Sequence, residues 1–238
     1  MSGDTTPTRT LVLTNDDGED APGLAALYEA TEGLGDRQVV APFGPYSGCG
    51  HVVTTHKPVV IARRGAGRFA VEGTPADCVR MAVHHLHPGL AWVVSGINAG
   101  GNLGTDTHHS GTAAAAREAA THGRPGIAVS HYIARGRAVD WRRAARWAKP
   151  VIADLMARPW EPNTFWNVNL PHPEPGAADP AVVFCPLDPS PLPLDYRLES
   201  DGLVAHYRGD YQARARVTGS DVDVCFGGRI AVTLVRLG

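Results

Sequence analysis

Apolar residues along this chain fall into short continuous runs separated by stretches with helical spacing. The short runs, several of them rich in β-branched residues, predict strands at 9–15, 38–41, 90–96, 125–130 and 164–171. Helical spacing predicts helices within 21–35, 74–86, 112–121 and 138–159. Strands that alternate with helices build a mostly parallel sheet with helices on both faces. The pattern therefore predicts an α/β fold, in which ligands bind at the carboxyl ends of the strands.

Individual residues predict where some of these elements begin or bend. Thr74, Pro75 and Asp77 form a helix start, with a capping hydroxyl, a proline in the first helical position and an acid in the first turn. Pro150 predicts a bend in the fourth helix, because proline removes a backbone hydrogen bond. Clusters of β-branched residues predict a hairpin-like pair of strands at 51–62 and 68–73.

The C-terminal part of the chain has a different composition. Eight prolines lie between residues 171 and 193, so long regular elements are not expected there. Two strand-like pieces follow, at 203–208 and 228–236. They could extend the sheet or form an arm that reaches another subunit.

Composition and charge exclude several classes of protein. Twenty-two basic and 24 acidic residues give a net charge of -2, which provides no general attraction to nucleic acid or to an anionic membrane. No stretch approaches about 18 uninterrupted apolar residues, and the N-terminus carries Asp4 where a signal peptide would be basic. The sequence thus predicts a cytoplasmic protein. Its scattered cysteines fit neither a disulfide framework nor a metal motif, and free thiols are expected at Cys49, Cys78, Cys185 and Cys225.

The first predicted strand ends in Asn15-Asp16-Asp17-Gly18, which places two carboxylates and an amide at one turn. Two like charges this close need a cation, and hard oxygen ligands suit Mg2+, Mn2+ or Ca2+. The same residues would also form an ordinary turn without a ligand, with Asp16 capping it and Asp17 in solvent. The position of these residues at the end of a strand does not decide between the two interpretations. The metal interpretation is favoured only when the other candidate ligand loops are considered with it.

A glycine-rich loop with two asparagines, Asn98 and Asn102, follows the strand at 90–96. Side-chain oxygens and backbone amides of this loop could approach a ligand, although tight turns alone would also explain the glycines. The loop lacks the fingerprint G-x-G-x-x-G because Ala99 stands at its first glycine position, and the chain has no Walker A motif. An NAD-linked enzyme is therefore not expected.

Two further segments carry hydroxyl groups near predicted strand or helix ends. Ser110-Gly111-Thr112 precedes the alanine-rich helix, where hydroxyls and free backbone amides could bind a phosphate or could simply cap the helix. Ser47 also lies in a loop after a strand. Because Ser47 lacks the flanking glycines of a nucleophile elbow, it is not expected to be a serine-hydrolase nucleophile.

Two pairs of adjacent histidines invite a zinc interpretation that their spacing does not support. Neither pair has the i, i+4 spacing or the cysteine partner of a zinc site. His84 and His85 are expected in packing or on the surface. His108 and His109 lie between two candidate ligand loops and could act as an acid, a base or a phosphate contact.

Several of these segments, taken in order, resemble the SurE family of survival-protein nucleotidases. They read LTNDDG, APG, VVAP, SG, EGTPADCV, VVSGINAGGNLG, SGT and GIAVS, and the later WNVNLP and GRIAVTLV also resemble that family. The resemblance implies a Rossmann-like three-layer αβα core with a C-terminal arm exchanged in dimers or tetramers. It also implies metal-dependent hydrolysis of nucleoside 5′- or 3′-monophosphates.

The resemblance also assigns expected roles to residues of this chain. It implies one divalent cation per subunit, Mg2+ or Mn2+, held by Asp16, Asp17, Ser47 and Asn98. Around the substrate phosphate it places Asn15, Asn102, Ser110, Gly111 and Thr112. Asp16 and Asn102 are the expected catalytic residues. The proton for the leaving oxygen could come from His108, His109 or water at the cation.

This chain departs from the family pattern in the loop at 43–51 and beside it. Tyr46 stands where an arginine is usual, Cys49-Gly50 replaces small polar residues, and His109 stands where an aromatic residue is usual. Substrate choice could therefore differ in this loop.

Together, the residues and the resemblance predict a phosphomonoesterase. We expect one domain over 1–238, with a metal- and phosphate-binding core at 1–137 and a proline-rich segment and oligomerisation arm at 171–238. The expected substrate is a nucleoside monophosphate or another small phosphomonoester, and the expected assembly is a homodimer or homotetramer without nucleic-acid or membrane partners. The alternative is a non-catalytic nucleotide- or metal-binding module on the same fold.

Overall fold

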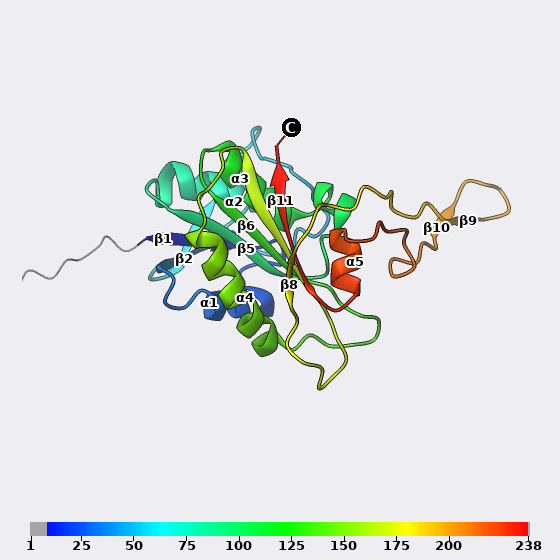
Figure 1. Cartoon of the computed structure of the whole chain (residues 1–238). Coiled ribbons are helices and arrows are strands. Elements are labelled where there is room, and N and C mark those ends of the chain that lie inside the picture. The colour runs from blue at the N-terminus through cyan, green and yellow to red at the C-terminus, as the bar shows by residue number, and fades with distance from the viewer. Residues whose placement is uncertain (1–8, 238) are drawn as a thin grey trace, which may run out of the picture.

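The computed structural model describes residues 9–237. Residues 1–8, which include Asp4 of the signal-peptide argument, and residue 238 lie outside the described part. A nine-stranded sheet forms the centre of the molecule (Figure 1). Across the sheet the strands are ordered β3 (Ile61–Gly65), β4 (Arg68–Val71), β2 (Asp36–Pro42), β1 (Thr10–Thr14), β5 (Trp92–Ala99), β6 (Gly126–His131), β7 (Thr164–Leu170), β11 (Ile230–Arg236) and β8 (Val182–Phe184).

Most neighbours in this sheet are parallel. The run from β4 through β2, β1, β5 and β6 to β7 is parallel throughout. At one edge β3 pairs antiparallel with β4, and at the other β11 pairs antiparallel with β7. The predicted α/β fold with a mostly parallel sheet is therefore confirmed.

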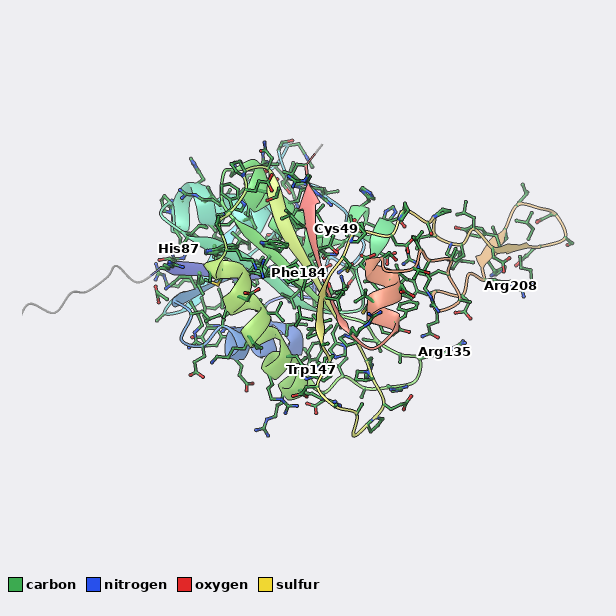
Figure 2. The ribbon with its side chains drawn as sticks, in the orientation of Figure 1. Cys49, His87, Arg135, Trp147, Phe184 and Arg208 are labelled. Atoms are coloured by element: carbon green, nitrogen blue, oxygen red, sulfur yellow. The ribbon has the colours of Figure 1, made fainter. Side chains whose placement is uncertain are left out.

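Helices cover both faces of the sheet, because successive strand residues point to opposite sides. Leu11 and Leu13 of β1 pack in a core with α1 (Pro22–Ala30) and α4 (Trp141–Ala157), the helix that carries Trp147 in Figure 2. Val12 points the other way, into a core that includes residues of α2 (Pro75–Met81) and α3 (Gly111–Thr121). The result is a three-layer αβα arrangement.

The order of the strands reverses at β1. From β1 the chain moves to β2 on one side, and it later returns to β5 on the other side. In open α/β sheets such a switch point leaves a crevice at the carboxyl ends of the two central strands, and ligands bind there. The crevice here lies beyond Thr14 and Ala99. Because β5 runs on to Ala99, Asn98, which was predicted in the loop after this strand, lies in the strand itself.

The predicted helix starts are confirmed. The Thr74 hydroxyl accepts a hydrogen bond from the N–H of Asp77 (3.2 Å), and the Asp77 carboxylate accepts one from the N–H of Thr74 (3.0 Å). Ser110 caps α3 by accepting from the N–H of Ala113 (3.0 Å). The fourth helix continues through Pro150 to its end, and the bend stays a prediction.

Some predicted boundaries were wrong. Only Ile61–Gly65 of the region around 51–62 is a strand, and the backbone N–H of Thr54 donates to the Asp77 carboxylate (2.8 Å) instead of to a neighbouring strand. The helix predicted to reach residue 86 is α-helical only as far as Met81 and ends in a π-helical turn, η1 (Ala82–Leu86).

The two strand-like pieces predicted in the C-terminal part are strands, β10 (Ala205–Tyr207) and β11, whereas β9 (Tyr196–Leu198) and a short helix, α5 (Asp221–Phe226), were not predicted. Helix α5 packs against β11, and β9 and β10 form a separate hairpin. In Figure 1 this hairpin stands away from the sheet beyond α5, and Figure 2 shows Arg208 beside it. All four cysteines are free, as predicted. Within residues 9–237, no helix is both long and apolar enough to cross a bilayer.

Candidate metal and phosphate site

One open pocket of about 340 Å³ at the switch point collects most of the predicted site residues. The predicted residues that line it are Asp16, Asp17, Ser47, Asn98, Asn102 and Ser110. The other lining residues are Gly48, Ala99, Gly101, Asp106, His109, Leu192 and Tyr211. The predicted residues come from four separate segments and thus meet around one space.

Asp16 lies at the base of this pocket with only 4% of its surface exposed. Its Oδ1 accepts a hydrogen bond from the hydroxyl of Thr112 on α3 (2.5 Å). Burial raises the pKa of Asp16 to about 6, the Thr112 hydrogen bond opposes this rise, and the nearby charge of Asp17 adds to it. The carboxylate is therefore held in an environment that favours a bound cation or a proton.

Gly111 lets the N-terminus of α3 approach this carboxylate closely. A Cβ at Gly111 would lie 2.8 Å from Cβ of Asp16, 2.9 Å from its Oδ2 and 3.1 Å from Sγ of Cys49. Such distances leave no room for a side chain. The partial positive charge at the helix N-terminus consequently lies next to the buried Asp16 carboxylate and favours its ionised form.

Asp17 and Asn98 lie on opposite sides of the β1–β5 crevice and are joined through the backbone. The N–H of Ala99 donates to Oδ2 of Asp17 (3.4 Å), and burial raises the pKa of Asp17. The amide nitrogen of Asn98 donates to the carbonyl of Gly100 (2.8 Å). Because the nitrogen is used there, the side-chain oxygen of Asn98 is the atom left for a ligand.

The loop that carries Ser47 is fixed to the site at three places. The N–H of Tyr46 donates to the backbone carbonyl of Asp16 (2.7 Å), and the N–H of Gly50 donates to the carbonyl of His109 (3.1 Å). Next along the loop, His51 Nε2 lies 2.7 Å from the Glu118 carboxylate on α3. Figure 2 labels Cys49 within this loop. These contacts with Asp16, His109 and α3 hold Ser47 at the pocket wall.

Glu118 is the buried acceptor for three side chains at that anchor. Arg80 on α2 (2.8 Å) and His122 on α3 (2.9 Å) contact Oε1, while His51 contacts Oε2. Burial raises the pKa of Glu118, but hydrogen bonds and charge from His51 and His122 lower it to about 2 overall. The ionised carboxylate therefore joins the Ser47 loop, α2 and α3.

Asn102 is oriented by buried amides on β7. Its N–H donates to Oδ1 of Asn169 (2.8 Å), and its carbonyl accepts from the side chains of Asn167 (2.8 Å) and Asn169 (3.0 Å). The Asn102 side-chain nitrogen donates to the hydroxyl of Ser130 (2.7 Å). Every one of these groups is buried, so Asn102 is held in one position at the pocket edge.

Three predicted phosphate contacts have other roles in this geometry and do not line the pocket. Asn15 donates to the carbonyl of Gly18 (2.8 Å), where a φ of +102° explains the glycine, and the Asn15 side-chain oxygen is buried without a partner. Thr112 binds Asp16, and Gly111 makes room for it. Their contact with substrate stays a prediction.

The donor set fits a hard divalent cation. Within residues 9–237, neither Asp16 nor Asp17 forms an ion pair with a basic side chain. In the same part of the chain, no three His, Cys, Asp or Glu residues form a metal cluster, so a zinc-type site is not seen. Two carboxylates, one amide oxygen and one hydroxyl are instead the oxygen ligands that Mg2+, Mn2+ and Ca2+ accept.

Sequence patterns missed three residues of the pocket wall, Asp106, Leu192 and Tyr211. Leu192 and Tyr211 lie 80 and 99 residues beyond Thr112, the end of the last predicted ligand loop, so no local signal could place them there. Of the two candidate histidines, His109 lines the pocket and His108 does not.

The protein has a doubly wound sheet, with oxygen ligands at its switch point and a helix N-terminus beside them. These features define a Rossmann-like α/β protein with a candidate cation and anion site. The family model described as "Survival protein SurE" matches residues 11–186. The chain therefore belongs to the SurE family, as its motifs predicted.

Similar proteins extend over most of the chain. A protein of Nostoc sp. (strain PCC 7120) named "Putative 5'-nucleotidase" is 50% identical over 96% of this chain and 100% of its own length. The 5'-nucleotidase SurE of Geobacter sulfurreducens is 44% identical over 68% of this chain and 62% of its own length. The crystal structure of the SurE protein from Aquifex aeolicus superposes with a TM-score of 0.85 at 28% identity, over 96% of this chain and 94% of that one.

Proposed function

We propose that this protein is a divalent-metal-dependent phosphomonoesterase that hydrolyses nucleoside monophosphates. One observation carries the proposal: Asp16, Asp17, Ser47 and Asn98 line one pocket that the N-terminus of α3 also borders. The names of the SurE relatives as 5'-nucleotidases support it.

Charge explains why a cation is needed in this pocket. Among residues 9–237, its lining includes the carboxylates of Asp16, Asp17 and Asp106 and no lysine or arginine, so a phosphate dianion alone would be repelled. Asp106 is already paired with Arg214 (2.8 Å), which leaves the first two carboxylates as the excess charge. A divalent cation bound there would neutralise them, polarise a phosphate oxygen and lower the pKa of water.

The protein groups around that position would bind and orient the phosphate. Ser110 offers a hydroxyl at the start of α3, and first-turn N–H groups of a helix are anion donors. Asn102 is held by its buried amide partners and would orient the substrate or the attacking water. Thr112 fixes Asp16 through its hydrogen bond. His109, the histidine that lines the pocket, is the side chain placed to donate a proton to the leaving oxygen.

The test is phosphate release from purified protein. The substrates are 5′-AMP, 3′-AMP, GMP, CMP and p-nitrophenyl phosphate, each with Mg2+, with Mn2+ and after EDTA. We expect turnover that EDTA abolishes, and a loss of at least about 100-fold in Asp16→Asn, because that variant removes a ligand charge. Asp20→Asn, an exposed carboxylate of the same segment, is the matched control and should retain activity.

Each other outcome has a definite meaning. Phosphate release that survives both EDTA and Asp16→Asn contradicts the metal-dependent mechanism. Nucleotide that binds in calorimetry without any release supports the non-catalytic binding module instead. A preference for the 5′- or 3′-monophosphate would assign the regiochemistry directly.

We also propose that the C-terminal arm joins subunits in a homodimer or homotetramer. The β9–β10 hairpin and the stretch just before it expose large apolar side chains, among them Leu203 (87% exposed) between the two strands and Leu194 (86% exposed) two residues before β9. Exposed apolar groups clustered on one projection are typical of a protein interface. Light scattering should show an oligomer for the natural sequence and a smaller species for Leu194→Asp/Leu203→Asp. A monomeric natural protein would contradict this role.

A further inference from the structure

The pocket at the switch point has a polar base and an apolar wall, and the two come from different parts of the chain. The base is built from loops that follow the strands and from α3. The large apolar side chains among the described lining residues are Leu192 and Tyr211, which belong to the segment between β8 and α5. The C-terminal segment therefore covers the pocket on a side that the phosphate-binding residues do not.

Tyr211 is fixed in place by hydrogen bonds at its hydroxyl end. Its Oη donates to Oδ2 of Asp106 (2.6 Å), and Nη1 of the buried Arg214 donates to the same oxygen (2.8 Å). Burial and the charge of Asp106 raise the pKa of Tyr211, so the hydroxyl stays protonated and keeps donating. Asp106 lies in the 3-10 helix η2 (Gly104–His108), directly before Ser110 of the candidate site.

Packing fixes the ring of Tyr211 as well. The guanidinium of Arg214 lies 5.1 Å from the ring centroid, and the ring of Phe226 on α5 lies 6.1 Å away. Gly101 lies beside the hydroxyl, and a Cβ there would make an ordinary contact with it at 3.4 Å. The side chain is half-buried, and Tyr211 lines the candidate site and also a neighbouring pocket with Arg208 and Asp210.

We propose that Tyr211 and Leu192 bind the nucleoside part of the substrate and set the preference for nucleoside monophosphates over phosphomonoesters with a small polar leaving group. The proposal rests on the proposed function, since it takes the phosphate to bind at Asp16 and Ser110. With the phosphate there, the organic part of the substrate extends toward the wall. A rigid aromatic ring beside a leucine binds the flat face of a base and loses little conformational entropy in doing so.

The experiment compares two substrates that share the phosphate and ribose and differ only in the base. These are 5′-AMP and ribose 5-phosphate, assayed with Mn2+ for the natural protein, Tyr211→Ala, Tyr211→Phe and Leu192→Ala. Phe184→Ala is the matched control, because Phe184 is an aromatic residue of the same C-terminal part, is 47% exposed and does not line the pocket.

We expect Tyr211→Ala to lower kcat/KM for 5′-AMP about 10-fold, mainly through KM, because a stacked base loses its partner. Turnover of ribose 5-phosphate should change less than about 2-fold, since no stacked base is lost. Leu192→Ala should cost about 3-fold for 5′-AMP alone, for one smaller apolar contact. Tyr211→Phe keeps the ring and should retain most of the preference for 5′-AMP, whereas Phe184→Ala should match the natural protein.

Other results overturn the inference without touching the proposed function. An equal loss for both substrates in Tyr211→Ala means that the residue only supports the fold of η2, and no loss for either means that the base binds elsewhere. If the natural protein hydrolyses neither substrate, the proposed function fails by itself. Calorimetric binding of the same two compounds with Mn2+ then tests the wall formed by Tyr211 and Leu192. Tyr211→Ala is expected to lower the affinity for 5′-AMP about 10-fold and the affinity for ribose 5-phosphate less than about 2-fold.

Discussion

Replacing Gly111 by alanine tests whether the first turn of α3 positions the Asp16 carboxylate. The added Cβ would lie 2.8 Å from Cβ of Asp16 and 2.9 Å from its Oδ2, whereas ordinary contacts begin at 3.4 Å. Asp16 or the helix must therefore move by about 0.6 Å to restore normal contact. Because Thr112 and Tyr46 also hold Asp16, the carboxylate cannot swing freely away.

The magnitude follows from this displacement. A misplacement of about 1 Å at a catalytic group can cost about 100-fold in rate, so a shift of 0.6 Å predicts a loss of about 10- to 100-fold in kcat/KM. Stability should fall by about 1–2 kcal/mol, because overpacking a buried site typically costs about 1–3 kcal/mol and the preference of alanine over glycine in a helix offsets only part of it. A loss of this size corresponds to a fall in Tm of about 2–8 °C for a chain of this size.

The assay measures phosphate release from 5′-AMP with Mn2+ together with thermal unfolding by circular dichroism. Gly89→Ala is the control, because a Cβ at Gly89 meets nothing within 4 Å and the residue lies outside the pocket. The reasoning is refuted if Gly111→Ala keeps full kcat/KM. A large fall in Tm with a proportional loss of activity would place the effect in folding instead of in the site.

Three further substitutions test other parts of the structure. Thr112→Val removes the donor to Asp16 and should weaken Mn2+ binding about 10-fold, since hydrogen bonds to charged groups contribute about 1.5–3 kcal/mol. Calorimetry measures the Mn2+ affinity, and an unchanged affinity would contradict the role of Thr112 in positioning Asp16. Glu118→Gln should lower the free energy of unfolding at pH 7 by about 3 kcal/mol, because the carboxylate pKa falls from 4.5 to about 2 on folding. That stabilisation is complete above about pH 4.5 and is lost as the pH falls toward 2. The free energies of urea unfolding of the natural protein and of Glu118→Gln should therefore become equal near pH 2. A difference that persists at this pH would show that the ionisation of Glu118 is not its cause. Gly23→Ala would bring a Cβ 1.9 Å from the Ile97 carbonyl and should cost about 3 kcal/mol or more in urea unfolding, a result that an unchanged midpoint would contradict.

Local pattern was sufficient for most of the core. Apolar runs predicted the parallel strands, and the residues at Thr74 and Ser110 predicted the helix caps, because a cap depends on atoms only two or three residues apart. The segment at 51–60 shows the limit of this reasoning. Its β-branched residues favour a strand, but the N–H of Thr54 is bonded to Asp77 on another element, a competition that no local pattern contains.

The candidate site divides in the same way. The sequence alone predicted the oxygen-rich loops at Asp16, Asn98 and Ser110, because each loop follows a strand or precedes a helix and has a chemistry that can be read from its residues. Only the tertiary structure brought Tyr211 to those loops, through its hydrogen bond to Asp106 across 105 positions of the chain. The physical reason is separation along the chain. The carboxyl ends of the strands converge in any sheet of this order, so the loops at these ends meet without further information. The wall formed by Leu192 and Tyr211 depends instead on how the C-terminal segment folds back through buried long-range contacts.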